Sequence, residues 1–291
     1  MPYRQPAGGG FLLKAVMVGG DRRMELTREL LIGRGYGVEW IRNEEMEHWQ
    51  EKICRSRLLI LPYPYTVKEG HIPGWENGGE GCIFNLLERL AHGTEIIAGM
   101  GMPEEAVTFA EARGLHLAAY SEDPVFLQRN AEISGEAAVE ALMQRSNAAL
   151  DEMCIVLLGY GLFGRAIAVR LRALGARIWV AARRQAQRQM AVRDGMVALS
   201  PEEIGTVAPH MDAVLNTIPA VVLGKEQLRA FSKQTIFLEL ASPPYGIDLP
   251  AAAQLGLNVQ VLPGLPTQYA PLSAARALAE TIANRFKEGQ S

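Results

Sequence analysis

The chain is poor in the residues that hold disulfide scaffolds and metal sites together. Its 291 residues include only three cysteines, Cys54, Cys82 and Cys154, which lie far apart and form no CxxC pair. Its five histidines show no spacing typical of metal ligands. This pattern is typical of a reducing compartment and argues against disulfides and zinc. We expect a cytoplasmic protein with no metal.

Excess charge and long apolar runs are also missing. The formal net charge is −3, and no basic tract resembles a footprint for nucleic acid or a membrane surface. No apolar run approaches the length of a membrane span, and Phe11–Gly20, which Lys14 interrupts, is typical of a strand rather than a signal peptide. We expect neither a nucleic-acid partner nor a membrane partner. Neither a P-loop nor a nucleophile elbow is present.

What the chain does have is a glycine-rich turn between a strand and a helix. Cys154–Leu158 is an apolar run of strand length, and apolar residues recur at helical spacing from Ala166 to Leu174. In this context Gly159 permits a tight turn, Gly161 lets a pyrophosphate approach the backbone, and Gly164 lets helix and strand pack closely. We expect a dinucleotide at this turn; a glycine-rich turn without a ligand is the alternative. The predicted contact residues are Gly159, Tyr160, Gly161, Leu162, Phe163 and Gly164.

The end of the next strand selects the cofactor. NAD sites usually place Asp or Glu there, to bind the ribose 2′-hydroxyl. In this chain the position falls near Ala182, and Arg183 and Arg184 follow it. Guanidinium groups suit a 2′-phosphate, so we predict NADP. The alternative is that both arginines begin a solvated basic helix, since Arg188 and Arg193 follow.

The organisation around this motif predicts an α/β protein of two domains. Strand-like runs alternate with helical patterns in two series, which is typical of parallel sheets covered by helices on both faces. We expect a C-terminal Rossmann domain with a doubly wound parallel sheet, and a smaller N-terminal flavodoxin-like or Rossmann-like domain. The predicted parts are a disordered tail at 1–10, a substrate domain at 11–125, an interdomain helix at 126–150, the NADP-binding domain at 151–270 and a C-terminal helix at 271–291.

Other strand ends supply candidate contacts. The fourth strand of the second series ends at Asn216, Thr217, Ile218 and Pro219, which we expect beside the nicotinamide half of the cofactor. Ala241 begins the turn after the fifth strand, and this turn is either a ligand contact or a rigid proline turn. In the first series, the long loop 62–81 follows the third strand, at the sheet edge where such folds bind ligands.

Three residues of the predicted interdomain helix are candidate catalytic residues. They are Asn130, Ser134 and Glu136. A carboxylate such as Glu136 can accept a proton when burial raises its pKa. The alternative is a helix-capping interaction between Glu136 and Ser134. The histidine and arginine that a 2-hydroxy-acid dehydrogenase needs after its last and fifth strands are missing from 262–273 and 241–246.

Taken together, the chain resembles the A chain of dipicolinate synthase from spore-forming bacteria over most of its length. The resemblance is carried by Gly19-Gly20-Asp21 with Arg23, Asn130-Ala131 with Ser134 and Glu136, the glycine motif, Asn216-Thr217-Ile218-Pro219, Leu240-Ala241-Ser242, and Pro263-Gly264-Leu265-Pro266 with Ala270-Pro271. The chain departs from the family pattern at Pro243-Pro244-Tyr245, where Arg-Pro-Gly is expected, and at Glu239, where Asp is expected. It also has Ile133–Ala137 where Pro-Thr-x-Glu-Gly is expected.

The resemblance implies a cytoplasmic oxidoreductase of sporulation. It would oxidise dihydrodipicolinate to dipicolinate with NADP and would have a flavoprotein-like partner, the second subunit of the synthase. By analogy with similar architectures we also expect a dimer. The two carboxylates of the substrate need donors, and the candidates are Gly19, Gly20, Asp21, Arg22, Arg23 and Arg129. The segment Gly19-Gly20 is equally well explained as a tight turn without a ligand, and Arg22 is equally well explained as a surface arginine. Two alternatives stay open: another NADP-linked dehydrogenase of a small carboxylate, and a nucleotide-sensing module without chemistry.

Overall fold

A computed structural model of the chain describes residues 14–42, 48–63, 72–75, 83–99 and 102–288. The chain folds into two compact units. Unit 1 comprises Met1–Arg129 together with Ala270–Ser291, and unit 2 comprises Asn130–Tyr269. The expected tail at 1–10 and most of the loop 62–81 lie outside the described residues. No helix in the described ranges is long and apolar enough to cross a membrane.

Unit 1 contains a five-stranded parallel sheet. Its order is β2-β1-β3-β4-β5, the order of flavodoxin-like folds, so the predicted class of this domain is confirmed. The order reverses between β1 and β3. The strands are β1 (Lys14–Val18), β2 (Gly37–Ile41), β3 (Leu58–Ile60), β4 (Glu95–Ala98) and β5 (His116–Ala119).

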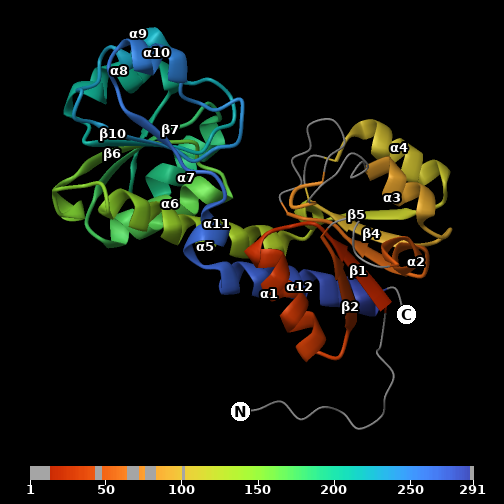
Figure 1. The fold of residues 1–291 in the computed structure, drawn as a ribbon. Coiled ribbons are helices and arrows are strands. Elements are labelled where there is room, and N and C mark those ends of the chain that lie inside the picture. Colours follow the sequence, from red (N-terminus) through yellow and green to blue (C-terminus); the bar gives the residue numbers. More distant parts are fainter. Residues whose placement is uncertain (1–13, 43–47, 64–71, 76–82, 100–101, 289–291) are drawn as a thin grey trace. The chain divides into compact units, whose positions relative to one another are not determined.

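Helices cover both faces of this sheet. One apolar core lies under α2, α3 and α4, and the other lies under α1 and α12, as Figure 1 shows. The helices are α1 (Arg22–Gly33), α2 (Trp49–Cys54), α3 (Ile83–Arg89), α4 (Glu104–Ala112) and α12 (Pro271–Glu288), with a 3-10 turn η1 (Tyr120–Glu122). Helix α12 follows all of unit 2 in the sequence but packs on α1. Its Leu278 and Ile282, four residues apart on one face of the helix, are fully buried.

Unit 2 contains a six-stranded parallel sheet with the Rossmann order. The order β11-β10-β9-β6-β7-β8 reverses between β6 and β9, and the predicted doubly wound parallel sheet is confirmed. The strands are β6 (Cys154–Leu158), β7 (Arg177–Ala181), β8 (Val197–Leu199), β9 (Ala213–Asn216), β10 (Ile236–Glu239) and β11 (Val259–Val261).

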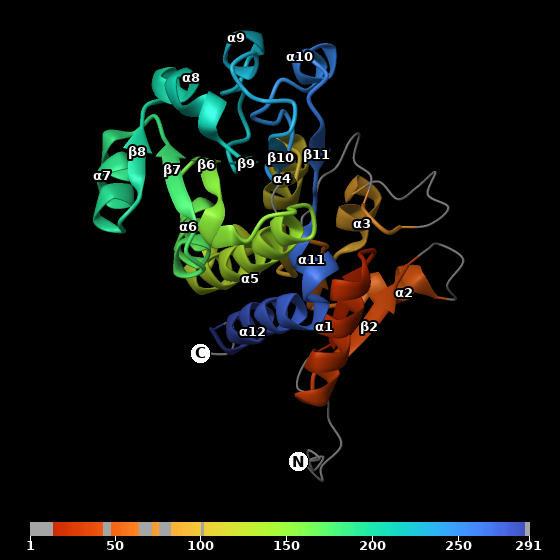
Figure 2. The same ribbon diagram turned by 90° about the vertical axis from the view of Figure 1, so that its left-hand side faces the viewer.

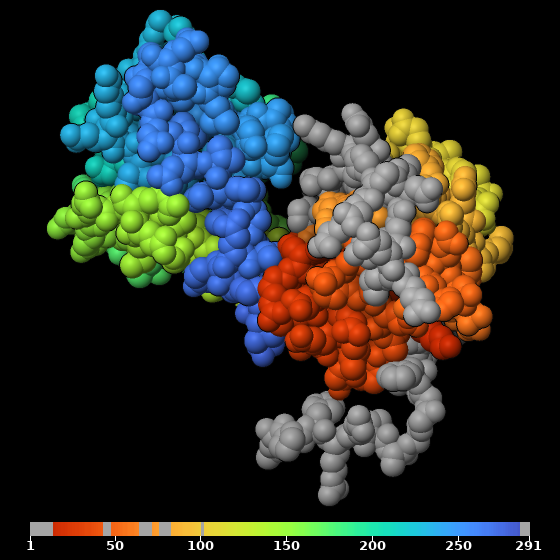
Figure 3. All heavy atoms as spheres, viewed as in Figure 1, coloured from red at the N-terminus to blue at the C-terminus, as the bar shows by residue number. Residues whose placement is uncertain are grey.

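Two helical layers cover this sheet. Helices α5, α6 and α7 pack on one face, and α8, α9 and α10 pack on the other (Figures 1 and 2). In Figure 3, light green atoms of the α5–α6 segment lie on the lower side of unit 2, and blue atoms of the α10 segment lie on its upper side. The helices are α5 (Pro124–Met143), α6 (Leu162–Ala173), α7 (Gln185–Arg193), α8 (Ile204–Val207), α9 (Lys225–Leu228), α10 (Leu249–Gln254) and α11 (Leu265–Tyr269). Short 3-10 turns are η2 (Leu150–Glu152), η3 (Pro201–Glu203) and η4 (Ala208–His210).

The helix expected over 126–150 is shorter than predicted. It begins at Pro124 and ends at Met143. Beyond it, the Ser146 hydroxyl accepts a hydrogen bond from the Ala148 N–H at 3.0 Å. Such a local bond between side chain and backbone competes with the helical hydrogen-bond pattern in the segment that was expected to continue the helix.

Truncation of α12 tests whether this C-terminal helix is part of the core of unit 1. Ile282→Ala should lower the free energy of unfolding of unit 1 by about 2–5 kcal/mol, because it leaves a cavity in a closed core. Leu272→Ala on the same helix is the control, since Leu272 is 43% exposed. Urea unfolding followed by tryptophan fluorescence measures the change, because Trp40, Trp49 and Trp75 lie in unit 1. Equal effects of the two variants would contradict this account.

Candidate functional site

The glycine turn lies where the strand order of unit 2 reverses. Gly159 follows the last residue of β6, Gly161 is the N-cap of α6, and Leu162, Phe163 and Gly164 form the first turn of that helix. In open parallel sheets, ligands bind at this place, outside the carboxyl ends of the strands. The first N–H groups of a helix have no partner within the helix and favour an anion.

Two of the three glycines are required by contacts within the protein. A Cβ on Gly159, where φ is +94°, would lie 2.6 Å from Thr217 Oγ1, and a Cβ on Gly164 would lie 2.3 Å from the Gly159 carbonyl oxygen. These are the tight turn and the close packing that the motif predicts. Gly161 differs, because a Cβ there would meet nothing within 4 Å and the residue is exposed. Its bare backbone is therefore accessible to a group from outside the protein, as a pyrophosphate requires.

Tyr160 faces the interior, although it lies inside the glycine motif. Its side chain is buried, and its hydroxyl donates a hydrogen bond to Asp194 Oδ2 at 2.8 Å. Burial and this bond raise the pKa of Tyr160, and the bond helps to hold the pKa of Asp194 below its usual value. A contact of Tyr160 with the cofactor would therefore be made by its backbone, and it stays a prediction. The residue supports the turn from below.

Asn216 also supports the site from within. Its side chain is fully buried at the end of β9, and its amide nitrogen donates to Glu239 Oε1 at 2.6 Å and to the Ile218 carbonyl at 2.9 Å. Its amide oxygen accepts from the Ile218 N–H at 3.0 Å. These bonds hold the side chain in place, and its predicted contact with the cofactor stays a prediction. Thr217, Ile218 and Pro219 lie further out and remain predicted contacts.

Glu239 organises the next turn, a role that the sequence did not suggest. Its carboxylate is fully buried and accepts from Asn216 and from the N–H groups of Ala241, Gly246 and Ile247, at 2.6 to 3.1 Å. Four donors make burial of this charge tolerable. The hydrogen bonds to Glu239 therefore account for the conformation of this turn. The only available signal was the departure from the family's Asp at a buried strand end.

The end of β7 holds three arginines rather than the predicted two. Arg183 and Arg184 are exposed, and Arg184 is the N-cap of α7. Arg188, one turn into α7, reaches back and donates from Nη1 to the carbonyl oxygens of Ala182 at 2.7 Å and Arg183 at 2.8 Å. The sequence pattern had placed Arg188 only in a solvated helix. In the structure, the Arg188 side chain instead stabilises the turn that contains Arg183.

Two of the three candidate catalytic residues make bonds within the protein, so their catalytic role stays a prediction. Asn130, Ser134 and Glu136 lie within α5, so the helix-capping alternative is wrong. The Ser134 hydroxyl donates to the Asn130 carbonyl at 2.7 Å, a bond within the helix. Glu136 pairs with Arg170 of α6 at 3.2 Å, and its side chain is 46% exposed. Because Arg170 is eight residues after Leu162, this pair lies about 12 Å along α6 from the turn. The pair borders a surface hollow between α5 and α6.

In unit 1, the N–H groups of both glycines in the turn after β1 are bound within the protein. The Gly19 N–H donates to Ile41 O at 2.9 Å, and the Gly20 N–H donates to Pro73 O at 2.6 Å. The Asp21 carboxylate caps α1 by accepting from the backbone of Arg23 at 3.0 Å. The helix terminus thus already holds an anion. Gly19, Gly20 and Asp21 thus form the tight turn that was the alternative, and a substrate contact through them stays a prediction.

The three candidate arginines of unit 1 differ in their surroundings. Arg22 is exposed and pairs with Glu25, as a surface arginine would. Arg129 is also exposed, on α5. Arg23 is only 2% exposed. It lies next to the reversal of strand order between β1 and β3, which is the ligand-binding position of such a sheet.

Arg23 is a buried cation without a carboxylate partner among the described residues. It donates to the Tyr63 carbonyl and lies over the Tyr63 ring, with its guanidinium carbon 5.3 Å from the ring centre. Tyr120 and Phe126 complete an aromatic cluster around Tyr63. The Nε atom of Arg23 is buried and has no hydrogen-bond partner among the described residues. Burial lowers the pKa of Arg23, because it disfavours the charged form.

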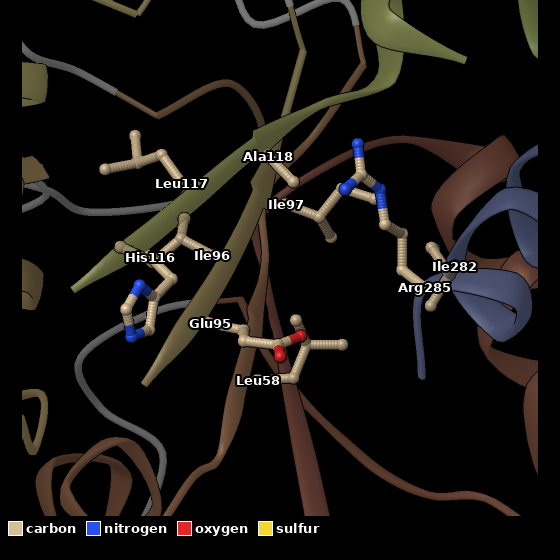
Figure 4. Close-up of a pocket in the computed structure, with 9 residues that line it drawn as sticks. All are labelled: Leu58, Glu95, Ile96, Ile97, His116, Leu117, Ala118, Ile282 and Arg285. Atoms are coloured by element: carbon tan, nitrogen blue, oxygen red, sulfur yellow. The ribbon is translucent and has the colours of Figure 1, made fainter. Parts of the chain in front are cut away.

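Two other kinds of site come into question besides the glycine turn and Arg23: a metal site and a surface hollow in unit 1. No group of acidic residues, histidines and cysteines could hold a metal in the described ranges. A hollow between β4, β5 and α12 is lined by Glu95, His116 and Arg285 (Figure 4). It opens at the amino ends of β4 and β5, whereas ligands of such sheets bind at the carboxyl ends. Arg285 is paired with Glu122 at 3.1 Å.

Comparison with known proteins places the chain among dehydrogenase-type folds. No protein-family model matches it. It is 25% identical to the A chain of dipicolinate synthase of Bacillus subtilis strain 168, over 96% of this chain and 97% of that protein. The crystal structure of that A chain from Bacillus subtilis has a TM-score of 0.82 at 24% identity, covering 96% of this chain and 97% of that one. The crystal structure of D-lactate dehydrogenase with NAD+ from Lactobacillus jensenii has a TM-score of 0.55 at 12% identity, covering 94% and 95%. The predicted resemblance is confirmed: the chain is similar to the A chain of dipicolinate synthase over nearly its whole length.

Proposed function

We propose that the chain is an NADP-dependent oxidoreductase that oxidises dihydrodipicolinate to dipicolinate. The observation that carries the proposal is the turn after β6, where Gly161 leaves bare backbone at a helix N-terminus while Gly159 and Gly164 pack within the protein. Similarity to the A chain of dipicolinate synthase supports the substrate. Loss of a hydride and a proton makes the dihydropyridine ring aromatic, so the protein mainly has to orient substrate and cofactor.

The residues of unit 2 fit the cofactor. The first turn of α6, from Leu162 to Gly164, would hold the pyrophosphate, and Thr217, Ile218, Pro219 and Ala241 would border the nicotinamide half. NADP, when bound, supplies the hydride acceptor. Arg183 and Arg184 would bind the 2′-phosphate, since neither forms an ion pair among the described residues and both are exposed.

The choice of NADP is tested by removing the two arginines. Arg183→Ala and Arg184→Ala should each weaken NADP binding about tenfold and leave NAD binding unchanged, because only NADP carries the 2′-phosphate. Arg193→Ala, at the far end of α7, is the matched control. Isothermal titration calorimetry with both dinucleotides measures the ratio. NAD bound by the unmodified protein as tightly as NADP would contradict the choice.

For the substrate, Arg23 is the donor that we retain. A buried guanidinium without a carboxylate is unfavourable until an anion pairs with it, and dipicolinate carries two carboxylates. The aromatic cluster of Tyr63, Tyr120 and Phe126 beside it would suit a flat ring. Arg129 stays a secondary proposal. Glu136 is not retained as the proton acceptor, because it is paired far along α6.

Replacement of Arg23 and of its neighbour separates a substrate contact from general surface charge. Arg23→Gln should weaken dipicolinate binding about 30-fold, as expected for one charge-assisted hydrogen bond. Arg22→Gln should change it less than twofold, because Arg22 lies on the surface with Glu25. Calorimetric titration with dipicolinate gives both values, and thermal unfolding confirms that each variant is folded. An Arg23→Gln protein that binds dipicolinate like the unmodified one would remove Arg23 from the site.

Two partner proposals accompany this function. One is the flavoprotein-like second subunit of the synthase, which the resemblance implies, and the other is a homodimer. Co-purification with that second subunit, expressed together with the chain, tests the first proposal. Light scattering of the isolated chain tests the homodimer separately. The sporulation role and the cytoplasmic location rest on the resemblance in the same way.

The activity is tested directly with both reactants. The protein mixed with NADP and enzymatically generated dihydrodipicolinate should produce reduced cofactor, followed by its absorbance. Turnover of another small carboxylate from a panel, but not of dihydrodipicolinate, would favour a different dehydrogenase on the same scaffold. Tight NADP binding without turnover, whether or not the flavoprotein-like partner is present, would favour a nucleotide-sensing protein.

A further inference from the structure

The carboxylate of Asp194 in unit 2 binds the residues on both sides of the glycine turn after β6. Asp194 Oδ2 accepts from the Tyr160 hydroxyl at 2.8 Å and from Arg165 Nε at 2.8 Å, and Oδ1 accepts from Arg165 Nη2 at 3.4 Å. Tyr160 precedes Gly161, and Arg165 follows Gly164. The Arg165 N–H also donates to the Gly161 carbonyl at 2.9 Å. The segment 161–164 is thus closed at both ends, while Gly161 itself remains exposed.

The position of this carboxylate is unfavourable for helix α7 taken alone. Asp194 is the C-cap of α7, where the helix macrodipole disfavours negative charge. A short polar residue without charge would satisfy the same helix end. The pKa of Asp194 is nevertheless held below its usual value, first by the Tyr160 hydroxyl and then by Arg165. The bonds to Tyr160 and Arg165 therefore give a reason for a carboxylate here that the helix does not.

The same bonds explain a tyrosine inside a glycine motif. Tyr160 is 2% exposed, and apart from a 3.6 Å contact with the Met196 sulfur its hydroxyl has only Asp194 as an acceptor among the described residues. A buried hydroxyl without an acceptor is costly, so the ring is held in one orientation. Because Tyr160 directly precedes Gly161, a fixed ring fixes the backbone at the start of the turn.

We propose that Asp194 is a positioning residue for the pyrophosphate of the bound dinucleotide, acting through Tyr160 and Arg165. This inference rests on the proposed function, since it requires a dinucleotide at the turn. Asp194 touches no ligand. It keeps the N–H groups of the first turn of α6 aligned before the ligand arrives, which lowers the cost of ordering them on binding.

The proposal predicts which ligands lose affinity. NADP and NAD share the pyrophosphate, so Asp194→Ala should weaken both about tenfold. Adenosine 2′-monophosphate lacks the pyrophosphate and should bind unchanged. Asp194→Asn keeps one oxygen acceptor and should recover part of the loss. Tyr160→Phe should show part of the loss of Asp194→Ala, because it keeps the bonds from Arg165 to Asp194. The double variant should be no weaker than Asp194→Ala, because the bond that Tyr160→Phe breaks is already lost there.

Calorimetric titration of the full chain with the three ligands carries out this test. Arg193→Ala on α7 and Tyr269→Phe elsewhere in unit 2 are the matched controls, since both residues are exposed. Thermal unfolding identifies any variant that fails to fold, in which case Tyr160→Phe and Asp194→Asn carry the test. Unchanged dinucleotide affinity in a folded Asp194→Ala protein would overturn the proposal, and so would a loss confined to NADP. An unmodified protein that binds neither dinucleotide would instead contradict the proposed function itself.

Discussion

The architecture of unit 2 depends on a backbone approach too close for any side chain. Gly164 comes so near to the carbonyl of Gly159 that a Cβ would lie at 2.3 Å, and Thr217 seals the same junction by donating to Leu158 O at 2.8 Å. This junction joins β6, α6 and β9 where the strand order reverses. Because α6 begins at this junction, directly after β6, its N-terminus lies at the carboxyl edge of the sheet. The candidate phosphate site follows from this steric constraint.

Two buried charges show opposite solutions to desolvation. Glu239 is surrounded by four N–H donors, and it uses them to shape the turn that contains Tyr245, whose φ is +66°. Arg23 has a carbonyl and an aromatic face, but one nitrogen has no partner. The charge of Glu239 is fully hydrogen-bonded within the fold, and the charge of Arg23 is not. That contrast is why Glu239 is interpreted as structural and Arg23 as a ligand contact.

The order of strands and helices was predictable because each parallel strand is a short apolar run between turn residues, as in Cys154–Leu158. The direction of individual side chains was not. Tyr160 turns inward because its acceptor, Asp194, lies 34 residues later, and no local pattern shows that pairing. Gly19 and Gly20 looked like an anion site, but their N–H groups are used by Ile41 and Pro73, which lie in other segments. Contacts between distant residues decided both cases.

Helix α7 is fastened at both ends. Arg188 ties its first turn to the end of β7, and Asp194, its C-cap, binds Tyr160. Each added or deleted helical residue rotates everything beyond it by about 100°. An insertion between these two anchors would therefore swing one of them out of reach. The length of α7 is therefore set by two contacts, one with the end of β7 and one with Tyr160, which follows β6.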